Sequence, residues 1–197
     1  MVAAVQNQYL TKRLSDHRFR LGMCVSLAAV LMLFTALTSA YIVRAASAND
    51  WQPLAMPQIL LLSTALILIS SGTLEAARRE LKAKAVSAYQ RWLLVTVLLG
   101  TGFLNAQLLA WKQLARQGVY LASNPHSSFF YLLTATHGFH LLGGLLALVY
   151  LVLRARRNKQ DQQGEAKQYA IVDAVTLYWH FMDGLWIYLF LLLFLWR

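Results

Sequence analysis

Charged residues are scarce in this chain of 197 residues, since Asp, Glu, Lys and Arg make up 13% of it and hydrophobic residues 58%. Soluble domains carry about 25% charged residues, so the deficit indicates a membrane protein. Acidic residues are the rarer kind, with 8 Asp and Glu against 18 Lys and Arg. The single cysteine, Cys24, excludes an intramolecular disulfide and a metal site built from several cysteines.

Motifs of common soluble enzymes are also missing. The sequence has no glycine-rich phosphate loop, no serine elbow of the hydrolase kind and no cysteine pair. Candidate functional residues must therefore be sought inside the hydrophobic segments.

Long hydrophobic runs fill most of the chain. A membrane-spanning helix needs about 20 predominantly apolar residues. Five segments meet this requirement, at 19–43, 55–77, 92–111, 129–153 and 174–196. We therefore predict an all-α fold, a polytopic membrane helix bundle with five transmembrane helices. The bundle forms a single domain over 19–197, after a cytoplasmic N-terminal tail at 1–18.

Basic residues favour one side of this predicted bundle. Fourteen of the 18 Lys and Arg lie before the apolar run that starts at Leu21 or in the segments that join spans two to three and four to five. Cytoplasmic loops are the ones rich in Lys and Arg. We therefore predict the N-terminus inside and the C-terminus outside, and interpret the formal charge of +10 as a topology signal rather than a nucleic-acid surface.

Four ionisable residues inside two predicted spans are the first candidates for a site. His137 and His140 lie in the fourth span, and His180 and Asp183 in the fifth. Each pair is three residues apart and shares a helix face. Asp183 and His140 fall at nearly the same depth when each residue rises about 1.5 Å. Because an unpaired ionisable group is costly in hydrocarbon, we expect Asp183 to pair with His140 or His180.

Several roles fit these residues. Three histidines and an aspartate could hold Zn, Cu or Fe, and two histidines on different helices could bind haem axially. Buried ionisable groups could also carry protons or ions. The simplest alternative is a packing network, in which polar side chains hydrogen-bond between helices.

Glu75 lies near the end of the second span, three and four residues before Arg78 and Arg79. This spacing predicts an ion pair within one helix. A carboxylate at this position could also accept protons or dock a partner.

The third span combines small and polar residues. Gly102, Ala106 and Ala110 recur every four residues, a pattern suited to close helix packing. Asn105 and Gln107 are polar at membrane depth and need partners there.

A polar segment at 123–128 precedes the fourth span. Its composition predicts a turn followed by a helix cap at Ser127 or Ser128. We expect His126 in this segment to be exposed and structural.

Two motifs resemble those of one family. The segment SFFYLLTATHGFHLLGG at 128–144 resembles the penultimate helix of subunit III of haem-copper oxidases, and YWHFMDGLW at 178–186 resembles its last helix. The segments at 100–107 and 63–75 also match the family pattern. Tyr178 and Trp179 in the last motif join the candidate packing and polar contacts.

The resemblance implies a non-catalytic core subunit of a bacterial aa3- or caa3-type cytochrome c oxidase, working in aerobic respiration in the plasma membrane. The family places haem and copper in subunits I and II and none in subunit III, which can hold phospholipid. Subunit III would pack against subunit I, lie in a complex with subunit II and support proton uptake. Cytochrome c would donate electrons to the complex and not to this chain. The resemblance favours a buried packing network over a metal site for five residues: Glu75, His137, His140, His180 and Asp183.

The sequence departs from the longer family members in two ways. It has five predicted helices where those have seven, so a lipid-holding cleft between two bundles cannot be carried over. Longer members also place a buried carboxylate before an Asn-Thr pair, whereas here the pair is Ser63-Thr64 and no acid lies between Asp50 and Glu75. An accessory subunit of a nitric oxide reductase system, an independent b-type cytochrome and a small ion transporter stay as alternatives.

Overall fold

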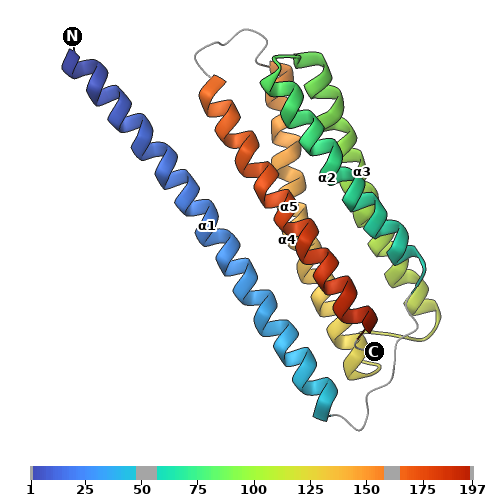
Figure 1. The fold of residues 1–197 in the computed structure, drawn as a ribbon. Coiled ribbons are helices and arrows are strands. Elements are labelled where there is room, and N and C mark those ends of the chain that lie inside the picture. Colours follow the sequence, from blue (N-terminus) through green and yellow to red (C-terminus); the bar gives the residue numbers. More distant parts are fainter. Residues whose placement is uncertain (1, 48–56, 158–164, 196–197) are drawn as a thin grey trace.

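Five long helices make up the described part of the chain, which covers residues 2–47, 57–157 and 165–195 of a computed structural model (Figure 1). Side chains are described at 21–47, 57–156 and 168–195. The helices are α1 (Val2–Ser47), α2 (Ile59–Lys82), α3 (Val86–Arg116), α4 (Pro125–Arg157) and α5 (Glu165–Leu195). Each contains a stretch long and apolar enough to cross a membrane. The predicted all-α class and the five spans are confirmed.

The helices alternate in direction along the chain, so the two ends of the chain lie at opposite ends of the bundle (Figure 1). The most extensive packing joins α2 and α3. A short turn connects them, in which Lys84 has a φ of 59°. A residue in this left-handed region commonly ends a helix. The two helices therefore form a tight antiparallel hairpin.

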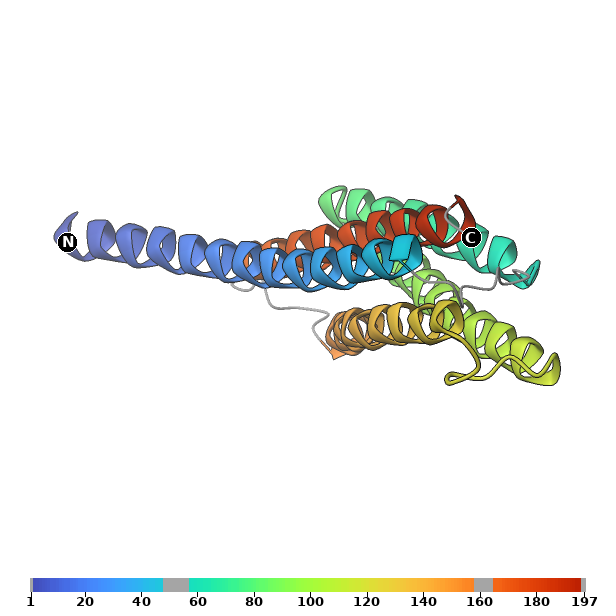
Figure 2. The same cartoon turned by 90° about the horizontal axis from the view of Figure 1, so that it is seen from below.

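Helix α1 is the outlying element. Among the described helices it packs on α4 and α5 alone, and its N-terminal part extends away from the others (Figures 1 and 2). It begins at Val2, so most of the predicted tail at 1–18 continues the first span as one helix. No glycine or proline interrupts residues 2–20, which explains this continuity. The cytoplasmic location of this segment stays a prediction.

The remaining helices also run past the apolar segments that predicted them. Helix α3 begins at Val86, six residues before the predicted span, and α4 continues to Arg157. Long basic side chains at helix ends can reach the polar interface, so a helix need not end where its apolar run ends. Residues 55, 56 and 196 of the predicted spans lie outside the described residues.

The start of α4 corrects the predicted cap. The backbone N–H of Ser127 donates to Oδ1 of Asn124 at 2.9 Å, and the N–H of Asn124 donates to Oγ of Ser127 at 3.2 Å. Asn124 is thus the capping residue, in a reciprocal arrangement with the third helical residue. The prediction of Ser127 or Ser128 as the cap was wrong by three or four residues.

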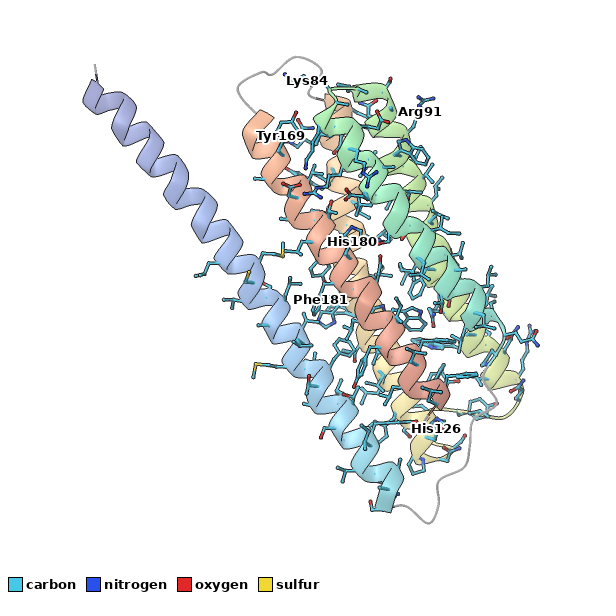
Figure 3. All side chains as sticks on the ribbon, in the orientation of Figure 1. Lys84, Arg91, His126, Tyr169, His180 and Phe181 are labelled. Carbon is cyan, nitrogen blue, oxygen red and sulfur yellow. The ribbon has the colours of Figure 1, made fainter. Side chains whose placement is uncertain are left out.

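Basic side chains gather at one end of the bundle. The turn between α2 and α3 lies at the same end as the last turns of α4 and the first turns of α5 (Figure 1). Lys84 and Arg91 mark this end in Figure 3, and His126 marks the opposite one. The segments predicted to be cytoplasmic therefore share one end, while the orientation of that end in a membrane stays a prediction.

Candidate polar site in the helix bundle

Trp179 anchors the centre of the bundle. Its side chain is fully buried between α3 and α4. A Cβ atom added at Gly100 would lie 2.9 Å from the Trp179 ring, and one added at Gly144 would lie 3.2 Å from it. These two glycines make room for the indole, and their role was not predicted. Trp179, Asp183 and Trp186 are spaced by four and three residues, so they form one buried column along α5.

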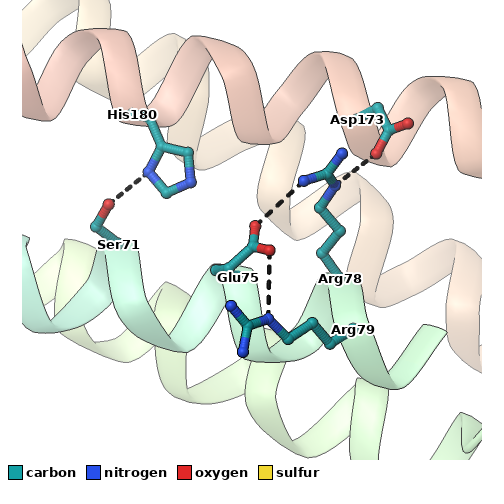
Figure 4. A network of polar contacts seen from close by, with 6 residues as sticks. All are labelled: Ser71, Glu75, Arg78, Arg79, Asp173 and His180. Carbon is teal, nitrogen blue, oxygen red and sulfur yellow. Dashed lines mark hydrogen bonds and ion pairs between the residues drawn. The ribbon is translucent and has the colours of Figure 1, made fainter. Parts of the chain in front are cut away.

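Hydroxyl side chains of α2 bind polar groups of α5. The indole N–H of Trp179 donates to Oγ of Ser70 at 3.0 Å, and that of Trp186 donates to Oγ1 of Thr64 at 3.0 Å. Next to the Ser70 contact, Oγ of Ser71 hydrogen-bonds to Nδ1 of His180 (Figure 4). Three hydroxyl groups of α2 thus each bind a nitrogen that α5 brings to the contact between the two helices.

A second set of contacts joins α2 to α3. The buried side chain of Gln107 donates from Nε2 to Oγ of Ser63 at 2.9 Å, while its Oε1 has no partner among the described residues. Hydroxyl groups of Thr73 and Thr96 meet at 2.8 Å. The sequence predicted that Gln107 needs a hydrogen-bond partner, and its side-chain nitrogen has one.

The predicted stripe on α3 lies mostly inside. Ala106 and Ala110 are buried, and Gly102 is half-buried beside Leu66, whose Cδ1 would lie 3.6 Å from an added Cβ. Asn105 behaves differently, because its side chain is exposed.

Ion pairs lie at the basic end of α2. Glu75 pairs with Arg78 at 3.4 Å and with Arg79 at 3.5 Å, so the predicted contact within the helix is confirmed. Arg78 also reaches across to α5, where its Nε lies 2.6 Å from Oδ1 of Asp173 (Figure 4). The Asp173 contact was not predicted, because sequence spacing shows which charges share a helix and not which helices are neighbours.

His140 is half-buried on α4 and bonds within its own helix. Its Nδ1 donates to the carbonyl oxygen of Thr136 at 2.8 Å. Its own carbonyl oxygen accepts a hydrogen bond from the Tyr178 hydroxyl at 2.9 Å. Tyr178 therefore connects α5 to α4 through the backbone of His140.

His137 and Asp183 are buried without hydrogen bonds. His137 is fully buried among the rings of Phe34, Phe103 and Trp186, with centroid distances of 6.3, 6.1 and 5.2 Å. Neither of its ring nitrogens has a hydrogen-bond partner among the described residues. Asp183 is 3% exposed, and both of its carboxylate oxygens lack a partner in the same part of the chain.

The expected pairing of Asp183 with His140 or His180 is therefore wrong for this structure. Ser71 occupies Nδ1 of His180, and Nδ1 of His140 turns to its own helix. Asp183 and His140 were expected to touch because they lie at the same depth. Their side chains, however, point in different directions from their helices. Within the described ranges, hydrogen bonds do not join Glu75, the three span histidines and Asp183 into one network.

Metal ligands do not gather in the described residues either. No group of three or more His, Cys, Asp or Glu side chains there could hold a metal ion. The candidate set formed by the three span histidines and Asp183 is thus dispersed. The expected lack of haem and copper in this chain stays a prediction.

His126 was expected to be exposed, and this was wrong. The structure buries it completely, with Nε2 at 3.4 Å from Oη of Tyr41 on α1. The hydrophobic helix α1 covers this end of α4, which the polar sequence around His126 did not indicate.

Comparisons with known proteins agree on one family. The family model described as "Cytochrome c oxidase subunit III" matches residues 6–197. A protein of Nocardia farcinica named "Probable cytochrome c oxidase subunit 3" is 35% identical over 174 residues, which cover 86% of this chain and 83% of that protein. The "Cytochrome c oxidase subunit 3" of Bacillus sp. strain PS3 is 29% identical, with 89% and 84% covered. The "Quinol oxidase subunit 3" of Bacillus subtilis strain 168 is 28% identical, with 86% and 83% covered.

Proposed function

From the membership of this chain in the cytochrome c oxidase subunit III family, we propose a specific place for it in a respiratory oxidase. Its family and its five apolar helices make it a multi-pass bacterial membrane protein and an oxidase subunit III. Our proposal is a non-catalytic core subunit of an aa3- or caa3-type enzyme, which reduces oxygen and translocates protons through its other subunits.

A stabilising role is supported by how the chain uses its buried polar groups. Ser70, Ser71 and Thr64 bind side chains of α5 rather than facing a cavity or a substrate. Such contacts fix the relative positions of helices. This observation carries the proposal, because a rigid bundle of this kind can brace a larger membrane subunit.

The proposed partners are subunit I, as the main contact, and subunit II, which would hold the haem and copper groups. Cytochrome c is the proposed donor to the complex, because the relatives above 30% identity bear the name of cytochrome c oxidase. The quinol oxidase relatives at 28% make a quinol the competing donor. Membrane lipids, phospholipid included, would contact the helix surfaces that no partner subunit covers.

Support for proton uptake is proposed at the basic end. Glu75, Arg78 and Asp173 form a partly exposed group of charges there. Ionisable side chains within or at the ends of membrane spans mark ion and proton pathways, and this group lies at the end proposed to face the cytoplasm.

Purification in mild detergent through a tag on this chain tests the assignment. We expect larger oxidase subunits in the eluate, a haem a absorbance band and oxidation of reduced cytochrome c. Oxidation of quinol alone would overturn the proposed donor. A colourless chain without partners would overturn the oxidase assembly, and a haem b band on the chain alone would make its histidines ligands.

A further inference from the structure

An exposed amide lies at membrane depth on α3. Asn105 is fourteen residues from Arg91 and seven from Lys112 along the helix, or about 21 Å and 10 Å at 1.5 Å per residue. Both charged residues mark the ends of the apolar run. The hydrocarbon core is about 30 Å thick, so Asn105 lies within it. Its side chain is exposed on the surface of this chain.

Hydrogen bonding leaves this amide incomplete. An asparagine side chain has two N–H donors and a carbonyl acceptor. Nδ2 of Asn105 donates to the carbonyl oxygen of Thr101 at 3.0 Å, which is its one side-chain hydrogen bond within the described residues. One N–H and Oδ1 therefore have no hydrogen-bond partner in the part of the chain that the structure describes. Polar groups without partners are strongly disfavoured in hydrocarbon, because lipid tails offer neither donors nor acceptors.

Three other exposed polar side chains in the spans find their hydrogen-bond acceptor within their own helix. Ser26, Thr35 and Thr101 each donate their hydroxyl proton to the carbonyl oxygen four residues earlier. A hydroxyl has one proton, so one such bond satisfies its donor. An asparagine cannot do the same, which separates Asn105 from the hydroxyl residues that tolerate lipid.

The surroundings of Asn105 suit a helix contact. We define the Asn105 face as the exposed residues that recur along α3 at three- and four-residue spacing: Leu94, Leu98, Thr101, Asn105 and Leu109. Leu98 is 63% exposed and Leu109 49%. The side of α3 that packs inside this chain bears other residues, among them Phe103, Ala106 and Ala110. The Asn105 face is thus an exposed, mainly apolar ridge, in which the hydroxyl proton of Thr101 is bonded within the helix and the amide of Asn105 keeps unused hydrogen-bonding capacity.

We propose that the Asn105 face docks on a transmembrane helix of another subunit of the oxidase. That helix would bear a hydrogen-bonding side chain, or a free backbone carbonyl, at the depth of Asn105. The hydrogen-bond capacity left over on Asn105 excludes a lipid tail as its natural neighbour and requires a polar group inside the membrane. The inference rests on the proposed function, which supplies the partner subunits.

Site-specific photo-crosslinking in the intact oxidase tests the position of the contact. A benzophenone amino acid replaces Leu98 or Leu109 on the Asn105 face, and Leu146 on α4, which is 70% exposed, is the matched control. We expect protein adducts with a larger oxidase subunit from both α3 positions and lipid adducts from Leu146. Equal adducts from all three positions, adducts with a second copy of this chain, or no protein adduct from α3 would overturn the inference.

The variant Asn105→Leu tests the amide itself. We expect its retention on the complex in detergent to fall about fivefold, the effect of losing one interhelical hydrogen bond. Thr35→Ala on α1 is the control and should leave retention unchanged. Full retention of Asn105→Leu would refute a role for the amide. Failure of the unaltered chain to bring down oxidase subunits would instead refute the proposed function, so the two failures are distinct.

Discussion

His180 and Asp183 lie within one turn of α5, yet they meet different surroundings. His180 faces α2, where Ser71 binds its ring. Asp183 faces the core between Trp179 and Trp186, where its carboxylate has no hydrogen-bond partner in the described residues, as is also true of His137. On the same helix, a ring nitrogen of His180 is therefore satisfied while the carboxylate of Asp183 is not. What separates the two side chains is direction: the ring of His180 reaches a hydroxyl group of α2, whereas the carboxylate of Asp183 does not, although the indoles of Trp179 and Trp186 on either side of it do.

The largest expected effect comes from removing the anchor shared by both regions. Trp179→Ala deletes a fully buried indole that contacts Gly100 and Gly144 and binds Ser70. We expect a loss of about 3–5 kcal/mol in stability, the usual cost of such a truncation. The measurement is the fraction of this chain that stays bound when the purified complex is heated, compared between the variant and the unaltered protein. Leu146→Ala, at a 70% exposed position, is the control, and an equal loss in both variants would contradict the anchoring role.

Asp183→Val tests the carboxylate that lacks a hydrogen-bond partner. The change removes a buried carboxyl group that has no partner in the described residues. We expect stability to rise by about 1–3 kcal/mol, the cost of an unsatisfied buried group. Thermal unfolding of the complex measures it, with Asp183→Asn as the control that keeps a polar group there. A loss of stability in Asp183→Val would reveal a partner for the carboxylate contributed by the assembled oxidase.

A double-mutant cycle measures the strength of the hydrogen bond between Ser71 and His180. Ser71→Ala and His180→Phe each remove one half of the hydrogen bond between α2 and α5. We expect a coupling free energy of about 0.6–1.7 kcal/mol, as found for hydrogen bonds inside membrane bundles. Unfolding in detergent of the two single variants and the double variant provides the cycle. Strictly additive effects would show that the bond contributes nothing to stability.

Arg78→Gln and Arg79→Gln give the smallest expected effects. Arg78 joins α2 to α5 through Asp173, whereas Arg79 contacts Glu75 on its own helix and its side chain is 78% exposed. We expect the Arg78 variant to lose up to about 1 kcal/mol and the Arg79 variant less, with both effects declining as salt is added. Unfolding at two salt concentrations measures both. A larger effect at Arg79 would assign that arginine to a partner subunit.

The fold was predictable because membrane spans follow from local composition. Each apolar run became a helix, and only the ends differed, because polar flanks such as 2–18 continue a helix without a breaking residue. The Glu75 ion pairs were predictable for the same reason, since both partners share one helix.

Contacts between helices were not predictable in the same way. The pairing of Asp183 failed because depth along a helix does not give the direction of a side chain. Gly100 and Gly144 gave no sign of holding Trp179, since their meeting depends on which helices are neighbours. The hydroxyl residues of α2 were a usable signal, because a helix so rich in Ser and Thr in a membrane is suited to binding polar side chains.

The arrangement of α1 has a consequence for biogenesis. Helix α1 leaves the ribosome before α4 and α5, the two helices on which it packs, through contacts such as that of the Tyr188 hydroxyl with Oγ1 of Thr38. Its docking surface therefore does not exist until α4 and α5 have been synthesised and inserted. The hairpin of α2 and α3, in contrast, can close as soon as its two helices enter the bilayer. During synthesis α1 must wait in the lipid without its final neighbours, so an insertase or chaperone that shields a single apolar helix would act on α1 first.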